Sequence, residues 1–171
     1  YTLTLNDNLE IPFDGSNLKT LNLNGNITIE GNNHKITGIA GGEQGDRFIE
    51  IKYGNITINN LNFDGSDKYA GILSDNTAAD HKPSLSISDC NFNNMNTKLT
   101  DNLYCNFGGS AISVVNTDIV AKKVNVSDSA GGNYGGGIYI EVTNDDLSGG
   151  TYVLQECNFT KCKTVAGGGA V

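Results

Sequence analysis

The acidic residue best placed by sequence for catalysis is Asp118, which ends the run Asn116-Thr117-Asp118. Hydrolysis of a glycosidic bond needs two carboxyl groups at a fixed separation. The next adjacent carboxyl pair, Asp145-Asp146, lies in a polar stretch that contains no His or Arg. The basic residues that assist such chemistry all precede Asp118: Arg47, His34 and His81. Asp118 is therefore a weak catalytic candidate, and the alternative is a backbone corner before Ile119.

Other carboxylates could bind a hard cation, because Ca²⁺ prefers clustered oxygen ligands. They fall in polar stretches: Asp75, Asp80, Asp101, Asp145 and Asp146. The sequence has neither an EF-hand pattern nor a glycine-aspartate nonapeptide repeat. We predict no metal site and no cofactor. Solvated loop carboxylates are the main interpretation, and Ca²⁺ binding by one loop stays open without a motif to support it.

Several tyrosines could act as flat platforms for sugar rings. Those outside the apolar pattern described below are Tyr53, Tyr69, Tyr104, Tyr134 and Tyr139. Three of them lie in or beside turns, where local packing is the alternative role for an aromatic ring. The candidate binding residues are these three turn tyrosines together with nearby polar residues: Tyr69, Tyr104, Tyr134, Asp101, Asn102, Asp145 and Asp146.

A repeated phrase must position all these side chains. In residues 55–63, Ile56 and Ile58 alternate with polar residues, Asn59-Asn60 interrupts, and Leu61 and Phe63 resume the alternation. Period-two alternation predicts strands, and Asn tolerates the backbone angles of a tight bend. The same spacing returns at Leu85-Ile87-Cys90-Phe92, at Ile119-Ala121-Val124-Val126 and at Tyr152-Leu154-Cys157-Phe159. The period is roughly 30 residues, in the range that indicates a solenoid, a propeller or an array.

A further Ile- or Val-rich strand precedes each phrase, at Ile49-Ile51, Ile112-Val114 and Ile138-Ile140. Each repeat therefore predicts a coil of three strands. Three polar stretches do not fit the coil and are predicted to protrude as loops: residues 75–83, 96–107 and 143–150. No window shows helical periodicity.

Coils of equal phase can stack so that each strand pairs in parallel with its copies above and below. We predict an all-β fold, a single-stranded parallel β-helix of about five to seven coils with loop insertions. Residues 1–171 would form one domain, with 1–48 as atypical first coils and 49–171 as regular coils. Inward residues would form ladders, for example Phe63-Phe92-Val126-Phe159. The rival fold is an antiparallel sandwich, which the fixed phase of the repeats disfavours.

Composition and charge limit the kinds of partner to be expected. The formal net charge is −8, which disfavours nucleic acid and anionic membranes as partners. No apolar run reaches the roughly 20 residues of a transmembrane helix, so we predict no direct membrane insertion. The chain opens at Tyr1 and stops at Val171 in an expected strand, so we expect an excised N-terminal piece of a longer protein.

Cysteine usage points to packing rather than metal binding. Cys90 and Cys157 occupy the same inward position two coils apart, about 9–10 Å, which is too far for a bridge. The main interpretation is that the cysteines pack as small apolar residues in the core. A bridge from Cys105 to Cys90 or to Cys162 stays open.

Glycine motifs carry a family resemblance. Gly168-Gly169-Ala170-Val171 matches the Gly-Gly-Ala-aliphatic motif of the polymorphic outer-membrane protein repeat, and two runs depart from it by one residue: Gly108-Gly109-Ser110-Ala111-Ile112 and Gly135-Gly136-Gly137-Ile138. The chain thus resembles adhesins and autotransporter passengers of that family. The resemblance implies a right-handed β-helix on the cell surface or secreted. Asn116-Thr117-Asp118 is in turn similar to the first motif of polygalacturonases, whose later motifs do not follow.

Three hypotheses for function follow. The first is an adhesin-like fragment whose loops bind a host protein or glycan. The second is a polysaccharide-active β-helix enzyme, or an inactive relative. The third is a structural fibre segment that associates end to end, since open coil ends expose strand edges.

Overall fold

The structure is a computed structural model of the 171-residue chain, and every regular element within its described residues is a strand. The described residues are 1–11, 20–39, 46–76, 82–97, 108–143, 150–164 and 167–171. They form 17 strands in three sheets, with six strands in sheets A and B and five in sheet C.

Each sheet collects one strand from every coil. Sheet A contains β1 (Thr2–Thr4), β4 (Ile27–Glu30), β7 (Asn55–Asn59), β10 (Ser84–Ser88), β13 (Asp118–Lys122) and β16 (Tyr152–Gln155). Sheet B contains β2 (Leu9–Ile11), β5 (Lys35–Gly38), β8 (Asn62–Asp64), β11 (Asn91–Asn93), β14 (Asn125–Ser127) and β17 (Asn158–Thr160). Sheet C contains β3 (Leu21–Asn24), β6 (Asp46–Tyr53), β9 (Tyr69–Asp75), β12 (Ile112–Val115) and β15 (Ile138–Glu141).

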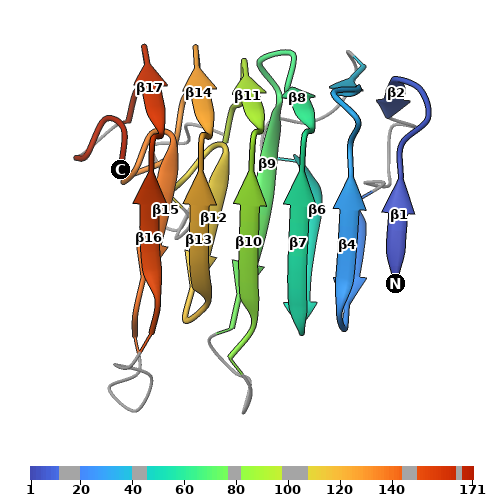
Figure 1. The fold of residues 1–171 in the computed structure, drawn as a ribbon. Coiled ribbons are helices and arrows are strands. Elements are labelled where there is room, and N and C mark those ends of the chain that lie inside the picture. Colours follow the sequence, from blue (N-terminus) through green and yellow to red (C-terminus); the bar gives the residue numbers. More distant parts are fainter. Residues whose placement is uncertain (12–19, 40–45, 77–81, 98–107, 144–149, 165–166) are drawn as a thin grey trace.

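The chain visits the sheets in the order C, A, B and then climbs to the next coil. All strand pairs are parallel, and Figure 1 shows the strands of sheet A side by side from β1 to β16. Sheet B lies above them in that view, and sheet C lies behind. The predicted parallel β-helix with three strands per coil is therefore confirmed.

The ladders expected from the repeated phrase are also confirmed. Leu85 pairs with Ile56 on one side and with Ile119 on the other, and Ile119 pairs in turn with Tyr152. The second ladder runs through Phe63, Phe92, Val126 and Phe159. Parallel pairing places equivalent side chains about 4.8 Å apart, so each inward residue packs on its own copies.

Four aromatic rings pack against one another in the core. Phe63 and Phe92 stack with centroids 4.6 Å apart and an interplanar angle of 7°. Phe48 packs against Phe63 at 5.8 Å and against Tyr69 at 5.3 Å. All four rings are buried, so their apolar area contributes directly to stability.

The four polar corners that join sheets A and B in the last four coils each turn on one residue in the left-handed region. These residues are Asn60, Asp89, Lys123 and Glu156, with φ of 52°, 52°, 52° and 55°. Only the first two are types that favour this region. The backbone amide of Lys123 donates to the Gln155 carbonyl at 2.8 Å, and that of Asp89 donates to the Lys122 carbonyl at 3.0 Å. At Lys123, pairing between coils thus holds a conformation that the residue type disfavours.

A row of asparagines follows the outer face of sheet B. The Asn91 amide donates to the Asn62 side-chain oxygen at 2.6 Å, and the Asn125 amide donates to Asn91 at 2.8 Å. Asn158 continues the row by donating to Asn125 at 2.9 Å. The stack of backbone hydrogen bonds is therefore extended by a stack of side-chain hydrogen bonds.

We predict that Phe92→Ala lowers the free energy of unfolding by about 3–5 kcal/mol, because it removes a fully buried ring between two neighbours. Urea unfolding followed by circular dichroism measures the change. Val120→Ala on the outer face of sheet A is the control, since Val120 is 39% exposed. Equal losses from the two variants would contradict the inward ladder.

Candidate functional site

Asp118 begins β13 at the corner where the chain passes from sheet C to sheet A. Here the corner consists only of Asn116 and Thr117, between β12 and β13. The equivalent connections from β9 to β10 and from β15 to β16 are longer and contain the loops predicted at residues 75–83 and 143–150. A short corner thus lies between two long ones.

Asn116 and Thr117 build the corner itself. Asn116 is buried in the left-handed region with φ of 49°. Its side-chain oxygen accepts the Thr143 backbone amide at 2.8 Å, and its own amide donates to the Thr143 hydroxyl at 2.8 Å. The buried Thr117 hydroxyl donates to the Val115 carbonyl at 3.0 Å and lies 2.7 Å from the Ser74 hydroxyl. The first two residues of this run, which resembles a catalytic motif, therefore hold the backbone at the corner.

Asp118 joins the coils on either side. One carboxylate oxygen accepts the Lys82 ammonium at 2.7 Å and the Thr151 backbone amide at 2.7 Å. Lys82 also donates to the Tyr152 hydroxyl at 3.2 Å, with its nitrogen 5.0 Å from the centre of that ring. Lys82 lies next to the last residue of the insertion at 75–83, and Thr151 directly follows the insertion at 143–150, so Asp118 ties their C-terminal ends together.

Burial opposes both charges of this pair, but the hydrogen bonds outweigh it. Burial would raise the pKa of Asp118, but the Lys82 and Thr151 donors hold that pKa below its ordinary value. Burial would lower the pKa of Lys82, but its bonds to Asp118 and Tyr152 raise that pKa above its ordinary value. Asp118 is thus an anion and Lys82 a cation throughout the neutral range.

This arrangement does not suit Asp118 to act as the general acid of glycoside hydrolysis. The general acid in such enzymes has a raised pKa and a second carboxyl group across the bond. Asp118 has a lowered pKa and accepts two strong donors. Within the described ranges, no three His, Cys, Asp or Glu side chains come together so that they could hold a metal ion.

Several predicted binding residues lie outside the described residues, so they remain predictions. They are Asp101, Asn102, Tyr104, Asp145 and Asp146. Cys105 lies outside them too, whereas Cys90, Cys157 and Cys162 are free thiols. Cys90 is buried, and burial raises its pKa to about 12. This fits the role of a small core residue.

The structure contradicts the prediction for Tyr69. We expected it outside the inward ladders as an exposed platform, but it is only 3% exposed. Its ring stacks on Phe48, and its hydroxyl donates to the Ile39 carbonyl at 3.3 Å. Gly38 makes room for it, because a Cβ there would lie 2.1 Å from the Tyr69 ring. The sequence signal that could have revealed this is the glycine one coil below.

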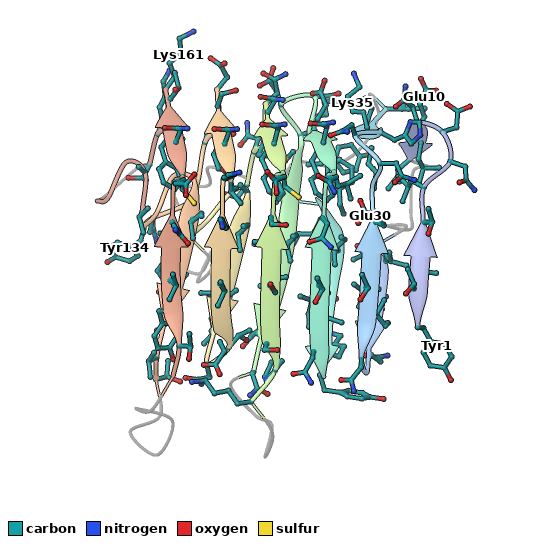
Figure 2. The ribbon with its side chains drawn as sticks, viewed as in Figure 1. Tyr1, Glu10, Glu30, Lys35, Tyr134 and Lys161 are labelled. Atoms are coloured by element: carbon teal, nitrogen blue, oxygen red, sulfur yellow. The ribbon has the colours of Figure 1, made fainter. Side chains whose placement is uncertain are left out.

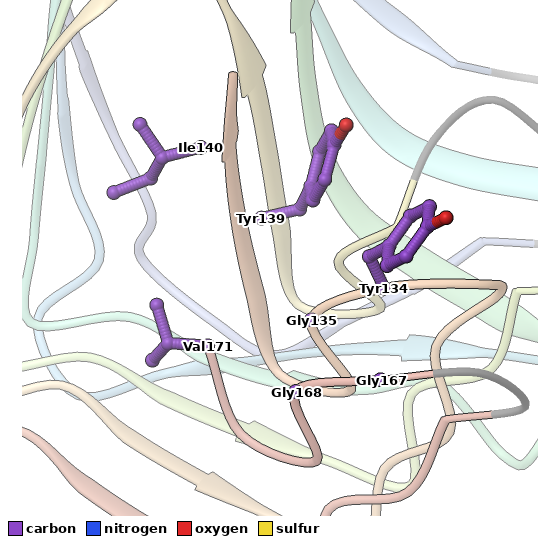
Figure 3. A pocket seen from close by; sticks show the side chains of 7 residues that line it. All are labelled: Tyr134, Gly135, Tyr139, Ile140, Gly167, Gly168 and Val171. Atoms are coloured by element: carbon purple, nitrogen blue, oxygen red, sulfur yellow. The ribbon is translucent and has the colours of Figure 1, made fainter.

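Tyr134, by contrast, is 55% exposed and projects from the ribbon (Figure 2). Its ring lies 6.4 Å from that of Tyr139, with 20° between the planes. Both line a pocket of about 510 Å³ with Gly135, Ile140, Gly167, Gly168 and Val171. Figure 3 shows both rings on one side of the strand that carries Tyr139, with Ile140 and Val171 on the other.

No protein-family model matches this chain, and no match was found among curated proteins or solved structures. The resemblance to the polymorphic outer-membrane repeat therefore stays a prediction. Its glycine motifs do stack in register, since Ile112 pairs with Ile138 and the Gly137 amide donates to the Ala170 carbonyl at 2.9 Å. That stacking is a property of the fold.

Sequence reasoning missed Lys82, Thr151 and Tyr152 as partners of Asp118. Lys82 and Tyr152 are 70 residues apart in the chain, and no motif connects them. The signal was the strand register: Ser84 pairs with Asp118, and Tyr152 pairs with Ile119. With that register drawn out, the three coils place these side chains at one corner.

We predict that Asp118→Asn lowers the free energy of unfolding at pH 7 by about 1 kcal/mol, because Lys82 loses its counter-charge. The lowered pKa of Asp118 means that its contribution is present above about pH 4 and is lost as the pH falls further. The raised pKa of Lys82 means that its contribution is lost only above about pH 10. Urea unfolding of both proteins from pH 2 to pH 11 measures the difference.

Asp128→Asn is the matched control, because Asp128 pairs with Lys161 at 3.2 Å while both side chains are about half exposed or more. Solvent weakens such a pair, so the control should cost less. A loss for Asp118→Asn that is small and constant across the whole pH range would contradict the ion pair as the source of stability.

Proposed function

We propose that this chain is a non-enzymatic, adhesin-like binding module of the cell surface. Its β-helix is a rigid scaffold, and its insertions contact a host protein or glycan. The observation that carries the proposal is the role of Asp118, whose charge is used to join the ends of two insertions. A carboxylate used in this way supports presentation of loops rather than bond cleavage.

The scaffold supports the same proposal. Insertions leave from two corners: those at residues 75–83 and 143–150 from the corner between sheets C and A, and that at 96–107 from the corner between sheets B and C. Their attachment points belong to the paired backbone. The Asn96 amide donates to the Tyr69 carbonyl at 2.9 Å, and the Thr97 amide donates to the Ala130 carbonyl at 3.0 Å. Insertions on a solenoid commonly carry the binding function.

A surface location rests on the resemblance of the glycine motifs to surface adhesins. None of the described segments is a helix of the length and hydropathy needed to cross a bilayer. The enzyme hypothesis would return if the chain released reducing ends or unsaturated products from pectin or alginate and if Asp118→Asn abolished that turnover.

We predict that replacing residues 98–107 with a short Gly-Ser linker weakens attachment but leaves thermal unfolding nearly unchanged. Loop closure costs only about 0.6 kcal/mol for each doubling of loop length, so a shorter loop has little effect on stability. Attachment is measured on an array of host glycans and matrix proteins, including fibronectin, laminin and collagen.

A second variant keeps the loop length and changes only Asp101, Asn102 and Tyr104 to Ser. Attachment should fall in both variants, while Val120→Ala on the outer face of sheet A should attach as the parent does. Loss of the fold on shortening the loop, or unchanged attachment in both variants, would contradict the division into scaffold and binding loops.

A further inference from the structure

The pair Tyr134 and Tyr139 is unusual among the aromatic residues of the described chain. Its rings are nearly parallel, with centroids 6.4 Å apart, whereas the other such ring pairs belong to the buried core. More than half of the Tyr134 surface is open to solvent. An open ring beside a second ring presents flat aromatic area that the core does not use.

Gly167 keeps one side of Tyr134 open. Its backbone pairs with Tyr134 on the preceding coil, and its amide donates to the Asn133 carbonyl at 3.1 Å. A Cβ at this glycine would meet only the Tyr134 ring, at 3.9 Å, which is an ordinary contact distance. A larger side chain here would fit the backbone and cover the ring.

A carboxylate lies beside the second ring of this pair, Tyr139. The Tyr139 hydroxyl donates to one oxygen of Glu141 at 2.8 Å. Burial, together with Glu141, raises the pKa of Tyr139 to about 12, so the phenol stays protonated and the hydrogen bond persists at neutral pH. A carboxylate has room for about four hydrogen bonds in all, so Glu141 can accept further hydroxyl donors.

We propose that Tyr134, Tyr139 and Glu141 form a subsite for one pyranose ring of an uncharged glycan. This inference rests on the proposed function and names the class of partner for one place on the scaffold. The ring would lie on Tyr134, and one of its hydroxyls would donate to Glu141.

The chemistry of the three side chains selects this class of ligand. The C–H groups on one face of a pyranose carry slight positive charge, and they meet the negative face of an aromatic ring favourably. The Glu141 carboxylate accepts a hydrogen bond from a sugar hydroxyl and repels an anion. The chain as a whole carries a formal net charge of −8, so an uronate or a sulfated sugar would meet repulsion at both levels.

The test is isothermal titration calorimetry of the intact chain with cellohexaose, mannohexaose and xylohexaose, and with an oligogalacturonate as the anionic comparison. At least one uncharged hexasaccharide should bind, and more tightly than the anion. Tyr134→Ala should weaken that binding by about tenfold, as loss of one stacked ring implies. Tyr134→Phe should retain it, because the ring remains.

Two further variants separate the subsite from general effects of substitution. Gly167→Leu should weaken binding as much as Tyr134→Ala does, while the Tyr134 ring remains in place. Tyr53→Ala should leave binding unchanged, because Tyr53 is 54% exposed, much like Tyr134, but is not part of this pair.

The proposal is overturned if no uncharged probe binds, if the oligogalacturonate binds best, or if Tyr134→Ala and Gly167→Leu bind like the parent. These results would leave the proposed function standing as long as the parent chain attaches to a matrix protein and the loop variants lose that attachment. Failure of attachment by the parent to every glycan and protein on the array would instead overturn the proposed function.

Discussion

Parallel hydrogen bonding between successive coils is the constraint on which the rest of this molecule depends. A strand in one coil leaves its donors and acceptors open until the next coil brings an equivalent strand beside it. The register is fixed at matching residues, as in the pairing of Leu85 with both Ile56 and Ile119. Once backbones are in register, every side chain must pack on its own counterparts. Equivalent side chains of successive coils thus form a column, and the residue type at one position must suit its neighbours in that column.

Columns account for most of the side chains that the structure describes. Inward columns put rings on rings, as in Phe63 on Phe92. Outward columns put amides on amides, as in Asn91 on Asn62. Even the bends follow the rule, since Lys123 adopts a left-handed conformation that its type disfavours and is held there by pairing with the next coil. At this bend, local preference gives way to pairing within the column.

The sequence predicted the features that recur from coil to coil and missed the contacts that occur only once. Alternation and the recurring phrase were sufficient for the ladders, the corners and the strands that repeat the phrase, because each is stated several times in the chain. They did not locate β9, the strand that precedes the second phrase. The contact of Lys82 with Asp118 and Tyr152 occurs once and spans three coils, so no repetition announces it. Tyr69 was misplaced for a related reason. Its burial depends on the absent side chain of Gly38 in the coil below, and a missing side chain is a faint signal.

Departures from a column are thus the places where a side chain makes contacts that its counterparts in other coils do not make. Asn26, Asn55 and Ser84 form one outward column through hydrogen bonds of 3.1 Å and 2.8 Å. Asp118 is next in that column and breaks it, since it turns to Lys82 and Thr151 instead. Tyr139 likewise pairs in register with the small, buried Ser113, yet it is a large ring that faces Tyr134. A scaffold of repeated residues tolerates such exceptions because neighbouring columns keep the coils in register. Single residues can therefore differ from their column without disturbing the winding that supports them.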